Sequence, residues 1–451
     1  MKKNDIFSVE ITSISNDGNG VGHADGMAVF VPFSAVGDRL QVRAQKVRDR
    51  YAFARITEIE KASADRVETD CEQYMQCGGC SLRHISYEAE LAAKQRMAQD
   101  AITRLGGFAL QAETILASPV QNFYRNKVQF PVAQDERGLY PGFYAARSHR
   151  VVDIAACCKL QDPLLGKIAQ DICRILGGFG VTAYDEQSGK GTLRHILLRK
   201  SSINGGILLC LVVNCRKLPC AAAAAKQIVQ LYPQIETVVL NRNLSRGNDI
   251  LSADCETVLG SGVIRDEICG VPVDVSALSF LQINREAAEQ LYRAVENLAQ
   301  LKSGETLIDL YCGAGTIGLA VTDDSHTLYG VESIADAVES AKKNAAAMGR
   351  RNAHFLCDDA GAVQKLLADG VKPDVIVTDP PRKGCSEDVL QAIVQSGAQR
   401  VVMVSCNVAT LARDLKKLCE NGYTLKTVQP ADLFPRTRHV EAAALLIKQP
   451  A

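Results

Sequence analysis

Asp309-Leu-Tyr-Cys-Gly-Ala-Gly-Thr-Ile-Gly318 decides the fold of the C-terminal part of this 451-residue chain. Gly313, Gly315 and Gly318 follow an apolar strand and precede a helix, as a tight turn under a closely approaching ligand requires. Around this loop, strands alternate regularly with helices. The pattern predicts an α/β domain with an open, doubly wound, Rossmann-like sheet. Its strands are expected at 306–312, 327–332, 353–357, 373–379, 400–406 and 442–448, and one helix at 333–349.

The segment that follows the fourth of these strands separates two classes of enzyme. Glu332 ends the second strand, where an acid can bind ribose hydroxyls. A glycine loop with such an acid suits a nicotinamide dehydrogenase as well as a methyltransferase. The fourth strand, however, ends at Asp379 and continues Pro380-Pro381-Arg382. A carboxylate held before two prolines at the ligand crevice favours a methyltransferase that acts on nucleobases or amides.

Reactive side chains lie next to two later strands of the predicted sheet. The fifth strand ends at Cys406, followed by Asn407 and a helix start, and a helix N-terminus lowers the pKa of a neighbouring thiol. His439 and Glu441 precede the last strand and are candidate bases. Uracil carbon 5 needs both groups, because a thiolate adding to carbon 6 activates it and a base then removes its proton. The alternative is a rim of polar loop residues.

The first 270 residues show two different patterns. Residues 5–60 alternate apolar and polar positions between Gly, Asn and Asp turns, which predicts a small OB-like β-barrel. A basic stretch at 41–55, with interleaved Tyr51 and Phe53, suits nucleic-acid binding, and a plain β-domain with a charged edge is the alternative. A helix is expected at 87–105. Beyond residue 120, mixed strands and helices predict an α+β domain whose aromatic residues suit stacked RNA bases or core packing.

Composition limits the location and the partners. Lys and Arg number 51, as do Asp and Glu, so net charge gives poor support for nucleic-acid binding. No apolar run approaches 18 residues and the first residues show no signal-peptide pattern, so we expect a cytoplasmic protein without a membrane segment.

Three of the 16 cysteines have the spacing of metal ligands. Cys71, Cys77 and Cys80 form C-x5-C-x2-C, which predicts a zinc or [4Fe–4S] site that needs a fourth thiolate. The adjacent Cys157 and Cys158 are the obvious source. Because neighbours on an extended chain point to opposite faces, only one of the two should be a ligand. Spacing alone does not choose between the two cysteines, or between the two metals.

Five motifs together carry a resemblance that covers essentially the whole chain. DLYCGAGTIGLA, DPPRKG, VSCNVATLARDL, FPRTRHVE and, at 279–284, SFLQIN resemble the RNA uridine-5-methyltransferase family, most closely its bacterial 23S ribosomal RNA branch. That branch has an N-terminal TRAM domain and an iron–sulfur cluster. The resemblance implies S-adenosyl-L-methionine and a [4Fe–4S] cluster as cofactors, 23S ribosomal RNA as partner and no protein partner. The T-loop uridine of transfer RNA is an alternative substrate, and a non-catalytic RNA-binding protein is an alternative of another class.

The same resemblance assigns roles to individual residues. It implies Cys406 as nucleophile, Glu441 as base and Phe280 as the ring that stacks on the flipped base, beside Asp379. The expected S-adenosylmethionine site comprises Gln282, Tyr311, Glu332, Asp379, Gly313, Gly315, Thr316 and Asp359. The family usually has Asn-Pro after the nucleophile, whereas this chain has Asn407-Val408, which should loosen the turn without removing a reacting group.

These assignments predict three domains. They are a TRAM barrel at 1–62, an iron–sulfur and RNA-binding domain at 63–270, and a catalytic domain at 271–451 on which about 91–121 can pack.

Overall fold

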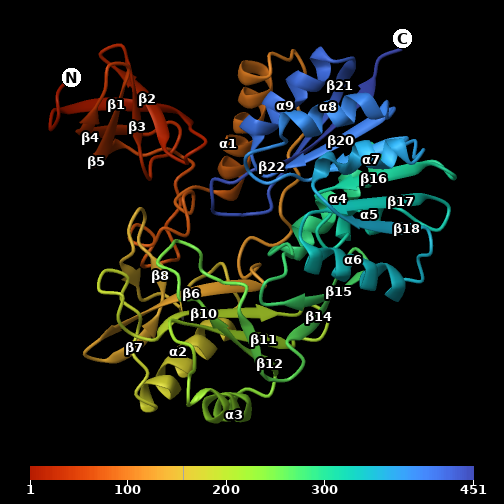
Figure 1. Ribbon diagram of the computed structural model, residues 1–451. Helices are drawn as coiled ribbons and strands as arrows, with labels where there is room; N and C mark the ends of the chain where they lie inside the picture. The colour runs from red at the N-terminus through yellow and green to blue at the C-terminus, as the bar shows by residue number, and fades with distance from the viewer. Residues whose placement is uncertain (156, 451) are drawn as a thin grey trace. The chain divides into compact units, whose positions relative to one another are not determined.

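The computed structural model describes residues 1–155 and 157–450 (Figure 1). The chain divides into two compact units. Unit 1 comprises Met1–Pro119, Pro380–Ser386 and Met403–Ala451, and unit 2 comprises Val120–Asp379 and Glu387–Val402. The division therefore passes through strand β20 (Arg400–Ser405). The bounds of the three predicted domains stay a prediction.

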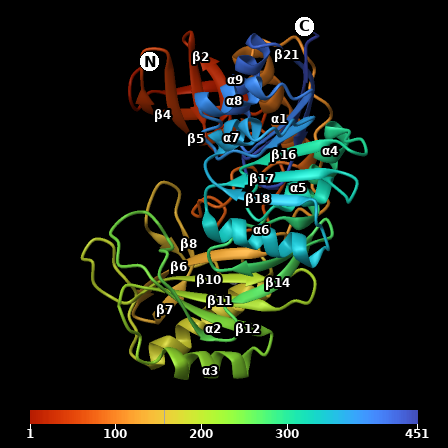
Figure 2. The same ribbon diagram turned by 45° about the vertical axis from the view of Figure 1, so that its right-hand side comes forward.

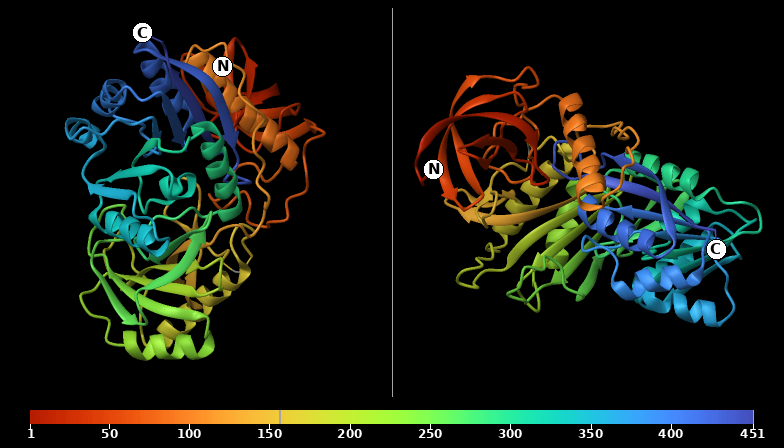
Figure 3. Two further views of the ribbon diagram at one scale, coloured as in Figure 1. Left: turned by 90° about the vertical axis from the view of Figure 1, so that its right-hand side faces the viewer. Right: turned by 90° about the horizontal axis from the view of Figure 1, so that it is seen from above.

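Unit 1 begins with a closed five-stranded barrel, whose curved strands are visible near the N-terminus in the right-hand view of Figure 3. Its strands follow the order β1-β2-β3-β5-β4. They are β1 (Ile6–Ile14), β2 (Gly20–Ala24), β3 (Met27–Val31), β4 (Arg39–Val47) and β5 (Tyr51–Lys61). Alternate residues such as Val9 and Ile11 point into the barrel core, while their neighbours lie on the surface. The predicted small N-terminal barrel is confirmed.

The rest of unit 1 consists of helices and a C-terminal hairpin. Helix α1 (Tyr87–Asp100) starts at Ser86, whose hydroxyl accepts a hydrogen bond from the Ala89 N–H, and continues as a short π-helix, Ala101–Leu105. Helix α9 (Val408–Glu420) precedes the antiparallel strands β21 (Tyr423–Ala431) and β22 (Glu441–Lys448). Leu116 forms a bridge with Ala431, so the chain after α1 lies along this hairpin.

Unit 2 contains a six-stranded mixed sheet with helices on one face, as Figure 2 shows. Its order is β13-β12-β11-β10-β6-β7. Those strands are β6 (Lys127–Asp135), β7 (Gly138–Pro141), β10 (Leu193–Lys200), β11 (Ile207–Val213), β12 (Ile235–Arg242) and β13 (Cys255–Leu259). Helices α2 (Pro163–Gly178) and α3 (Ala221–Leu231) close the core against this sheet. Two hairpins complete this part: β8 (Phe143–Tyr144) with β9 (Val151–Val152), and β14 (Val263–Ile268) with β15 (Val271–Ser276).

A seven-stranded sheet in the order β18-β17-β16-β19-β20-β22-β21 holds the predicted cofactor loop. Strands β16 (Thr306–Leu310), β17 (Thr327–Glu332), β18 (Ala353–Cys357) and β19 (Val375–Thr378) are parallel. The connecting helices are α4 (Arg285–Ala299), α5 (Thr316–Val321), α6 (Ala335–Ala347), the 3-10 helix Ala360–Ala362, α7 (Val363–Ala368) and α8 (Glu387–Ser396). Chain order reverses between β16 and β19, which is where such sheets bind ligands. The predicted fold class is therefore confirmed.

Among the helices that the structure describes, none has the length and apolar character needed to cross a membrane.

Candidate active site

The glycine loop after β16 adopts the backbone that its sequence predicts. Tyr311, Gly313 and Gly315 have φ values of +62°, +54° and +75°. At Gly315, which precedes α5, a Cβ atom would lie 2.9 Å from the Phe355 ring. At Gly318, it would lie 2.9 Å from Asp309 Oδ2. Glycine is thus required at the second position by both φ and space, and at the third by close helix–strand packing.

Glu332 is hydrogen-bonded directly to this loop. The Gly313 N–H donates to Glu332 Oε2 at 3.1 Å, and the Ile334 N–H donates to Oε1 at 2.9 Å. Thr316, the first residue of α5, has its hydroxyl 3.0 Å from that of buried Tyr292. Asp359 caps the 3-10 helix by accepting from the Gly361 N–H at 2.8 Å. Among the predicted cofactor residues, the structure therefore joins Glu332 to Gly313 by a hydrogen bond.

Two acids at the ends of β16 and β19 share a shielded environment. Burial raises the pKa of Asp379 to about 6. Burial likewise raises the pKa of Asp309 to about 7, opposed by the Gly318 N–H and increased by Asp379 and Glu332. Asp309 Oδ2 accepts from that N–H at 2.9 Å, whereas its buried Oδ1 has no hydrogen-bond partner in the described part of the chain. Asp309 was not among the site residues predicted from the sequence, although this acid begins the glycine motif.

Asp309 gives a pH-dependent prediction for stability. Its pKa rises from 3.8 to about 7 on folding, so the folded chain binds more protons than the unfolded chain between these values. We expect wild-type stability to fall relative to Asp309→Asn as pH rises through this window, by at most about 1.4 kcal/mol per pH unit. Urea unfolding at a series of pH values measures this difference. Asp336→Asn, on the exposed start of α6, should show none; equal slopes for wild type and Asp309→Asn would contradict the shift.

The segment SFLQIN lies between β15 and α4 and is held by its backbone. The Asn126 side chain donates to the Gln282 carbonyl at 3.0 Å, and the Arg199 guanidinium donates to the Ser279 carbonyl. These bonds leave the Phe280 ring 72% exposed, the most exposed of the large hydrophobic side chains identified on the surface. The base-stacking role of Phe280 and the cofactor role of Gln282 stay predictions.

Cys406 stands between β20 and α9 in unit 1 and is partly exposed. The next residue, Asn407, is the N-cap of α9: its Oδ1 accepts from the Ala409 N–H at 3.1 Å, and its Nδ2 donates to the Arg382 carbonyl at 3.1 Å. The helix starts at Val408 without the usual proline, because the Asn407 side chain bonds both the helix and a neighbouring loop.

That neighbouring loop is the rest of the Pro-Pro-Arg motif. Thr410 Oγ1 also donates to the Arg382 carbonyl, at 3.3 Å, and the Arg413 guanidinium donates to the Lys383 carbonyl at 3.0 Å. The Cys385 N–H donates to buried Asp414 at 2.9 Å. Helix α9 therefore fixes the motif from several points. The motif VSCNVATLARDL contains Thr410, Arg413 and Asp414, but these three contacts were not predicted from it.

The two predicted bases lie at the end of the β21–β22 connection. Glu441 is the first residue of β22, is 5% exposed and faces Ala431 across the hairpin. His439 Nδ1 is 3.5 Å from Arg382 Nη2, and its ring contacts that of Phe434 edge-on at 5.8 Å. The assignment of Glu441 rather than His439 as the base stays a prediction.

The cysteine loop of unit 1 has features that suit thiolate ligands. The Gly79 N–H donates to Cys77 Sγ at 3.3 Å, a contact typical of cluster-bound sulfur. Burial lowers the pKa of the Arg83 guanidinium, but Asp70, Cys80 and Cys71 outweigh it and raise that pKa. A cation thus lies near two of the three cysteines. Within residues 1–155 and 157–450, however, no group of three or more His, Cys, Asp or Glu side chains is gathered as a metal site. The [4Fe–4S] cluster stays a prediction.

The expectation that only one of Cys157 and Cys158 is a ligand rested on an extended chain, which the structure does not show. Both N–H groups donate to the Ile154 carbonyl at 3.1 Å, so the chain turns here. Cys157 is exposed and its Sγ lies 3.7 Å from that carbonyl, whereas Cys158 is partly buried. Alternation along a strand therefore cannot assign the ligand.

Comparison with known proteins places the chain in a family. Residues 273–449 match the tRNA (Uracil-5-)-methyltransferase family and residues 2–57 the TRAM domain. An uncharacterized RNA methyltransferase of Halalkalibacterium halodurans is 40% identical over 99% of this chain and 98% of its own, and one of Bacillus cereus is 38% identical over 99% and 98%. The chain belongs to the RNA uracil-5-methyltransferase family. This assignment favours methyl transfer over the dehydrogenase alternative.

A solved structure has the same fold as this chain. The tRNA (uracil-54, C5)-methyltransferase of Pyrococcus abyssi, in complex with S-adenosyl-L-homocysteine, matches with a TM-score of 0.77. It is 24% identical and the match covers 98% of this chain and 100% of that one.

Proposed function

We propose that this protein transfers a methyl group from S-adenosyl-L-methionine to carbon 5 of uridine in RNA, through a covalent adduct of Cys406. The observation that carries the proposal is the position of Cys406. In a chain of the uracil-5-methyltransferase family, a partly exposed cysteine directly precedes the N-cap of α9. A helix N-terminus stabilises the thiolate that the reaction needs.

The proposed reaction uses two groups of the chain in sequence. The Cys406 thiolate forms a bond to uracil carbon 6, and the ring becomes an enolate whose carbon 5 is nucleophilic. S-adenosyl-L-methionine supplies an electrophilic methyl group, which carbon 5 takes up. Glu441 then accepts the carbon 5 proton, the bond from carbon 6 to sulfur breaks, and Cys406 leaves as thiolate.

The loop after β16 is the proposed cofactor site. Its left-handed residues leave the backbone open to a close ligand, and Glu332 ends the neighbouring strand β17, where a carboxylate suits the ribose hydroxyls. Buried Asp309, with one oxygen that no described residue satisfies, marks the same loop as a polar site. Gln282, Tyr311, Thr316, Asp359 and Asp379 belong to this proposal. The S-adenosyl-L-homocysteine of the Pyrococcus abyssi enzyme supports the choice of cofactor.

We propose 23S ribosomal RNA as the substrate, on the resemblance of the motifs to that branch. RNA binding is supported by the TRAM barrel, where the rings of Phe30, Tyr51 and Phe53 lie within 6.0 Å of one another, beside the basic stretch 41–55. Aromatic rings with nearby cations suit unpaired bases and phosphates. Transfer RNA is the rival substrate, since the matched family and the solved structure both name it.

Methyl transfer to purified RNAs tests this proposal. The protein is incubated with methyl-labelled S-adenosyl-L-methionine and unmodified 23S ribosomal RNA or unmodified transfer RNA. We expect label in ribosomal RNA. Label in transfer RNA alone would overturn the substrate but not the chemistry, and label in neither would overturn the proposed enzyme.

Cys71, Cys77, Cys80 and either Cys157 or Cys158 are the proposed ligands of a [4Fe–4S] cluster. The N–H of Gly79 and the nearby Arg83 would stabilise cluster sulfur and its negative charge. No step of the proposed reaction needs an electron, so the cluster's proposed role is structural.

We expect anaerobically purified protein to contain iron and acid-labile sulfide and to absorb visible light broadly, as iron–sulfur proteins do. Cys77→Ser should lose both, because it removes a thiolate ligand. Separate Cys157→Ala and Cys158→Ala variants identify the fourth ligand, and Cys220→Ala serves as the matched control. Zinc in place of iron, or an unchanged iron content in Cys77→Ser, would contradict the assignment.

A further inference from the structure

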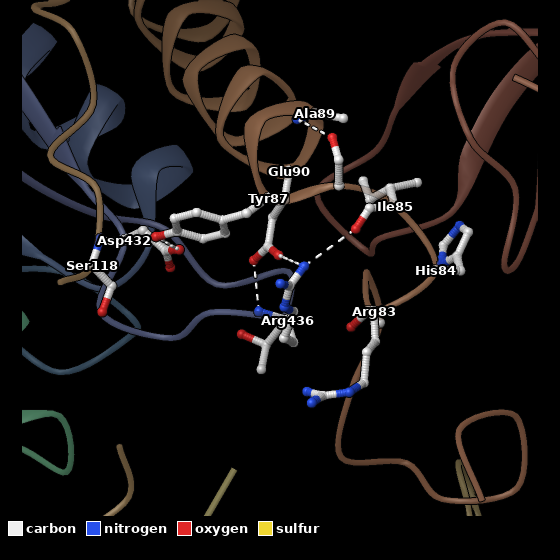
Figure 4. A network of polar contacts seen from close by, with 12 residues as sticks. Arg83, His84, Ile85, Tyr87, Ala89, Glu90, Ser118, Asp432 and Arg436 are labelled. Atoms are coloured by element: carbon white, nitrogen blue, oxygen red, sulfur yellow. Dashed lines mark hydrogen bonds and ion pairs between the residues drawn. The ribbon is translucent and has the colours of Figure 1, made fainter. Parts of the chain in front are cut away.

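The nine residues 432–440 connect β21 to β22, and we call them the base loop because Glu441 follows them directly. Two charged side chains of α1, Glu90 and Lys94, have exposed fractions of 0% and lie against this loop. Their carboxylate and ammonium groups are 2.8 Å apart. Asp432, at the start of the base loop, is equally buried. Figure 4 shows Glu90 and Arg436 of this contact.

Lys94 holds the first turn of the base loop. Its Nζ is 2.7 Å from Asp432 Oδ1 and donates to the Phe434 carbonyl at 3.1 Å. The same Asp432 oxygen accepts from the Phe434 N–H at 3.1 Å, while Asp432 Oδ2 accepts from the Tyr87 hydroxyl at 2.9 Å. One ammonium group therefore ties two residues of the loop to α1.

Glu90 holds the middle of the base loop through Arg436. The Arg436 N–H donates to Glu90 Oε1 at 2.7 Å, and its guanidinium donates to the Ile85 carbonyl at 3.2 Å (Figure 4). Arg436 has φ +68°, a conformation that non-glycine residues adopt only when their surroundings enforce it. Its carbonyl accepts from the N–H groups of Ser81 and Leu82 at 2.9 and 3.1 Å, so the residues directly after Cys80 also hold it.

Hydrogen bonds inside the base loop continue this support toward the catalytic end. The Phe434 carbonyl that accepts from Lys94 also accepts from Thr437 Oγ1 at 2.8 Å. Thr437 Oγ1 in turn accepts from the His439 N–H at 3.3 Å. A continuous series of hydrogen bonds thus joins Lys94 to a residue two positions before Glu441.

Charge is balanced among the charged side chains that join α1 to the base loop. Glu90 and Asp432 are opposed by Lys94 and by Arg436, whose Nη1 lies 3.7 Å from Glu90 Oε2. Burial raises the pKa of Glu90, and Lys94 opposes that shift. Fully buried ion pairs contribute little net stability compared with apolar packing, but they impose a definite geometry. These four charged side chains are therefore better suited to fixing the base loop than to stabilising the fold.

We propose that Glu90 and Lys94 are positioning residues for Glu441, acting through the base loop. This inference rests on the proposed function, in which Glu441 takes the carbon 5 proton. It assigns a role in the reaction to a helix that ends at residue 100, far before the predicted catalytic domain at 271–451, and carries none of the family motifs quoted above.

Steady-state kinetics of Lys94→Met and Glu90→Gln test the proposal. We expect kcat to fall about 100-fold in each, the scale of a displacement of about 1 Å in a catalytic group, with kcat/KM for both substrates nearly unchanged because only a step after methyl transfer is slowed. The covalent complex with RNA should accumulate, because removal of the proton is the step that is slowed. Arg96→Met is the matched control, since Arg96 lies on the same helix with its side chain exposed, and should behave as wild type.

Hydrogen exchange keeps the test decisive if Lys94→Met does not fold. Glu90→Gln retains side-chain size and should exchange the 434–439 amides faster than wild type, with barrel amides unchanged. Folded variants with wild-type kcat, or with unchanged exchange in the base loop, would overturn the proposal. If wild-type protein methylates no RNA, the proposed function is wrong. Faster exchange in Glu90→Gln would still show that Glu90 positions the base loop.

Discussion

Cys406→Ala is expected to abolish formation of 5-methyluridine without unfolding the protein. Without the thiolate, carbon 5 of uracil cannot attack a sulfonium methyl group at a useful rate, so turnover should fall roughly 10⁶-fold, as in other enzymes that lose their nucleophile. Initial rates with labelled S-adenosyl-L-methionine and ribosomal RNA measure the loss. Binding of S-adenosyl-L-methionine should remain, because Cys406 is not one of the proposed cofactor residues and none of them lies in α9.

Cys419→Ala is the control for this variant. Cys419 is in the last turn of the same helix, α9, and burial raises the pKa of its thiol, which disfavours thiolate. It should retain wild-type turnover. Substantial turnover in Cys406→Ala would rule out Cys406 as nucleophile and leave the covalent mechanism without its central group.

Glu441→Gln is expected to stop the reaction after methyl transfer. The amide cannot accept the carbon 5 proton, so the bond between Cys406 and carbon 6 persists and the methylated RNA stays attached to the protein. Turnover should fall about 10²- to 10⁴-fold, the range for loss of a general base. A denaturing gel with methyl-labelled S-adenosyl-L-methionine should show the label migrating with the protein–RNA adduct.

The exposed Glu420, at the end of α9, provides the matched substitution: Glu420→Gln should release methylated RNA normally. His439→Gln distinguishes the second candidate base. If His439→Gln rather than Glu441→Gln accumulates the labelled adduct, the assignment of the base is wrong.

The C-terminal fold could be predicted because its signals are local. The predicted strand 327–332 matches β17 and the predicted strand 353–357 matches β18, since apolar runs there are bounded by turns and helices. Strand β21 was not predicted. Its sequence, YTLKTVQPA, mixes polar residues with a terminal proline, and only pairing with β22 defines it as a strand.

The candidate site residues come from the same local signals. Motifs at strand ends single out Asp379, Cys406 and Glu332, because carboxyl ends of parallel strands meet at one edge of a doubly wound sheet, and the roles of these residues stay predictions. The raised pKa of Asp309 depends on burial and on acids elsewhere in the chain, which spacing does not reveal. The turn at Ile154, where strand alternation was expected around Cys157 and Cys158, could likewise not be predicted from spacing.

Glu90 and Lys94 show the limit of local signals most clearly. Glu and Lys four positions apart on a helix are typical of a solvated face. Here both are fully buried, because Asp432 and Arg436, more than 300 residues later, supply the opposite charges. The sequence of the helix alone does not indicate these partners.

Identification of the modified nucleoside tests the central claim most directly. Ribosomal RNA lacking the modification is incubated with the protein and labelled S-adenosyl-L-methionine, digested completely and separated by chromatography with mass spectrometry. We expect the label to elute as 5-methyluridine and to disappear with Cys406→Ala. Label in methylcytidine, in a methylated purine or on ribose would contradict it.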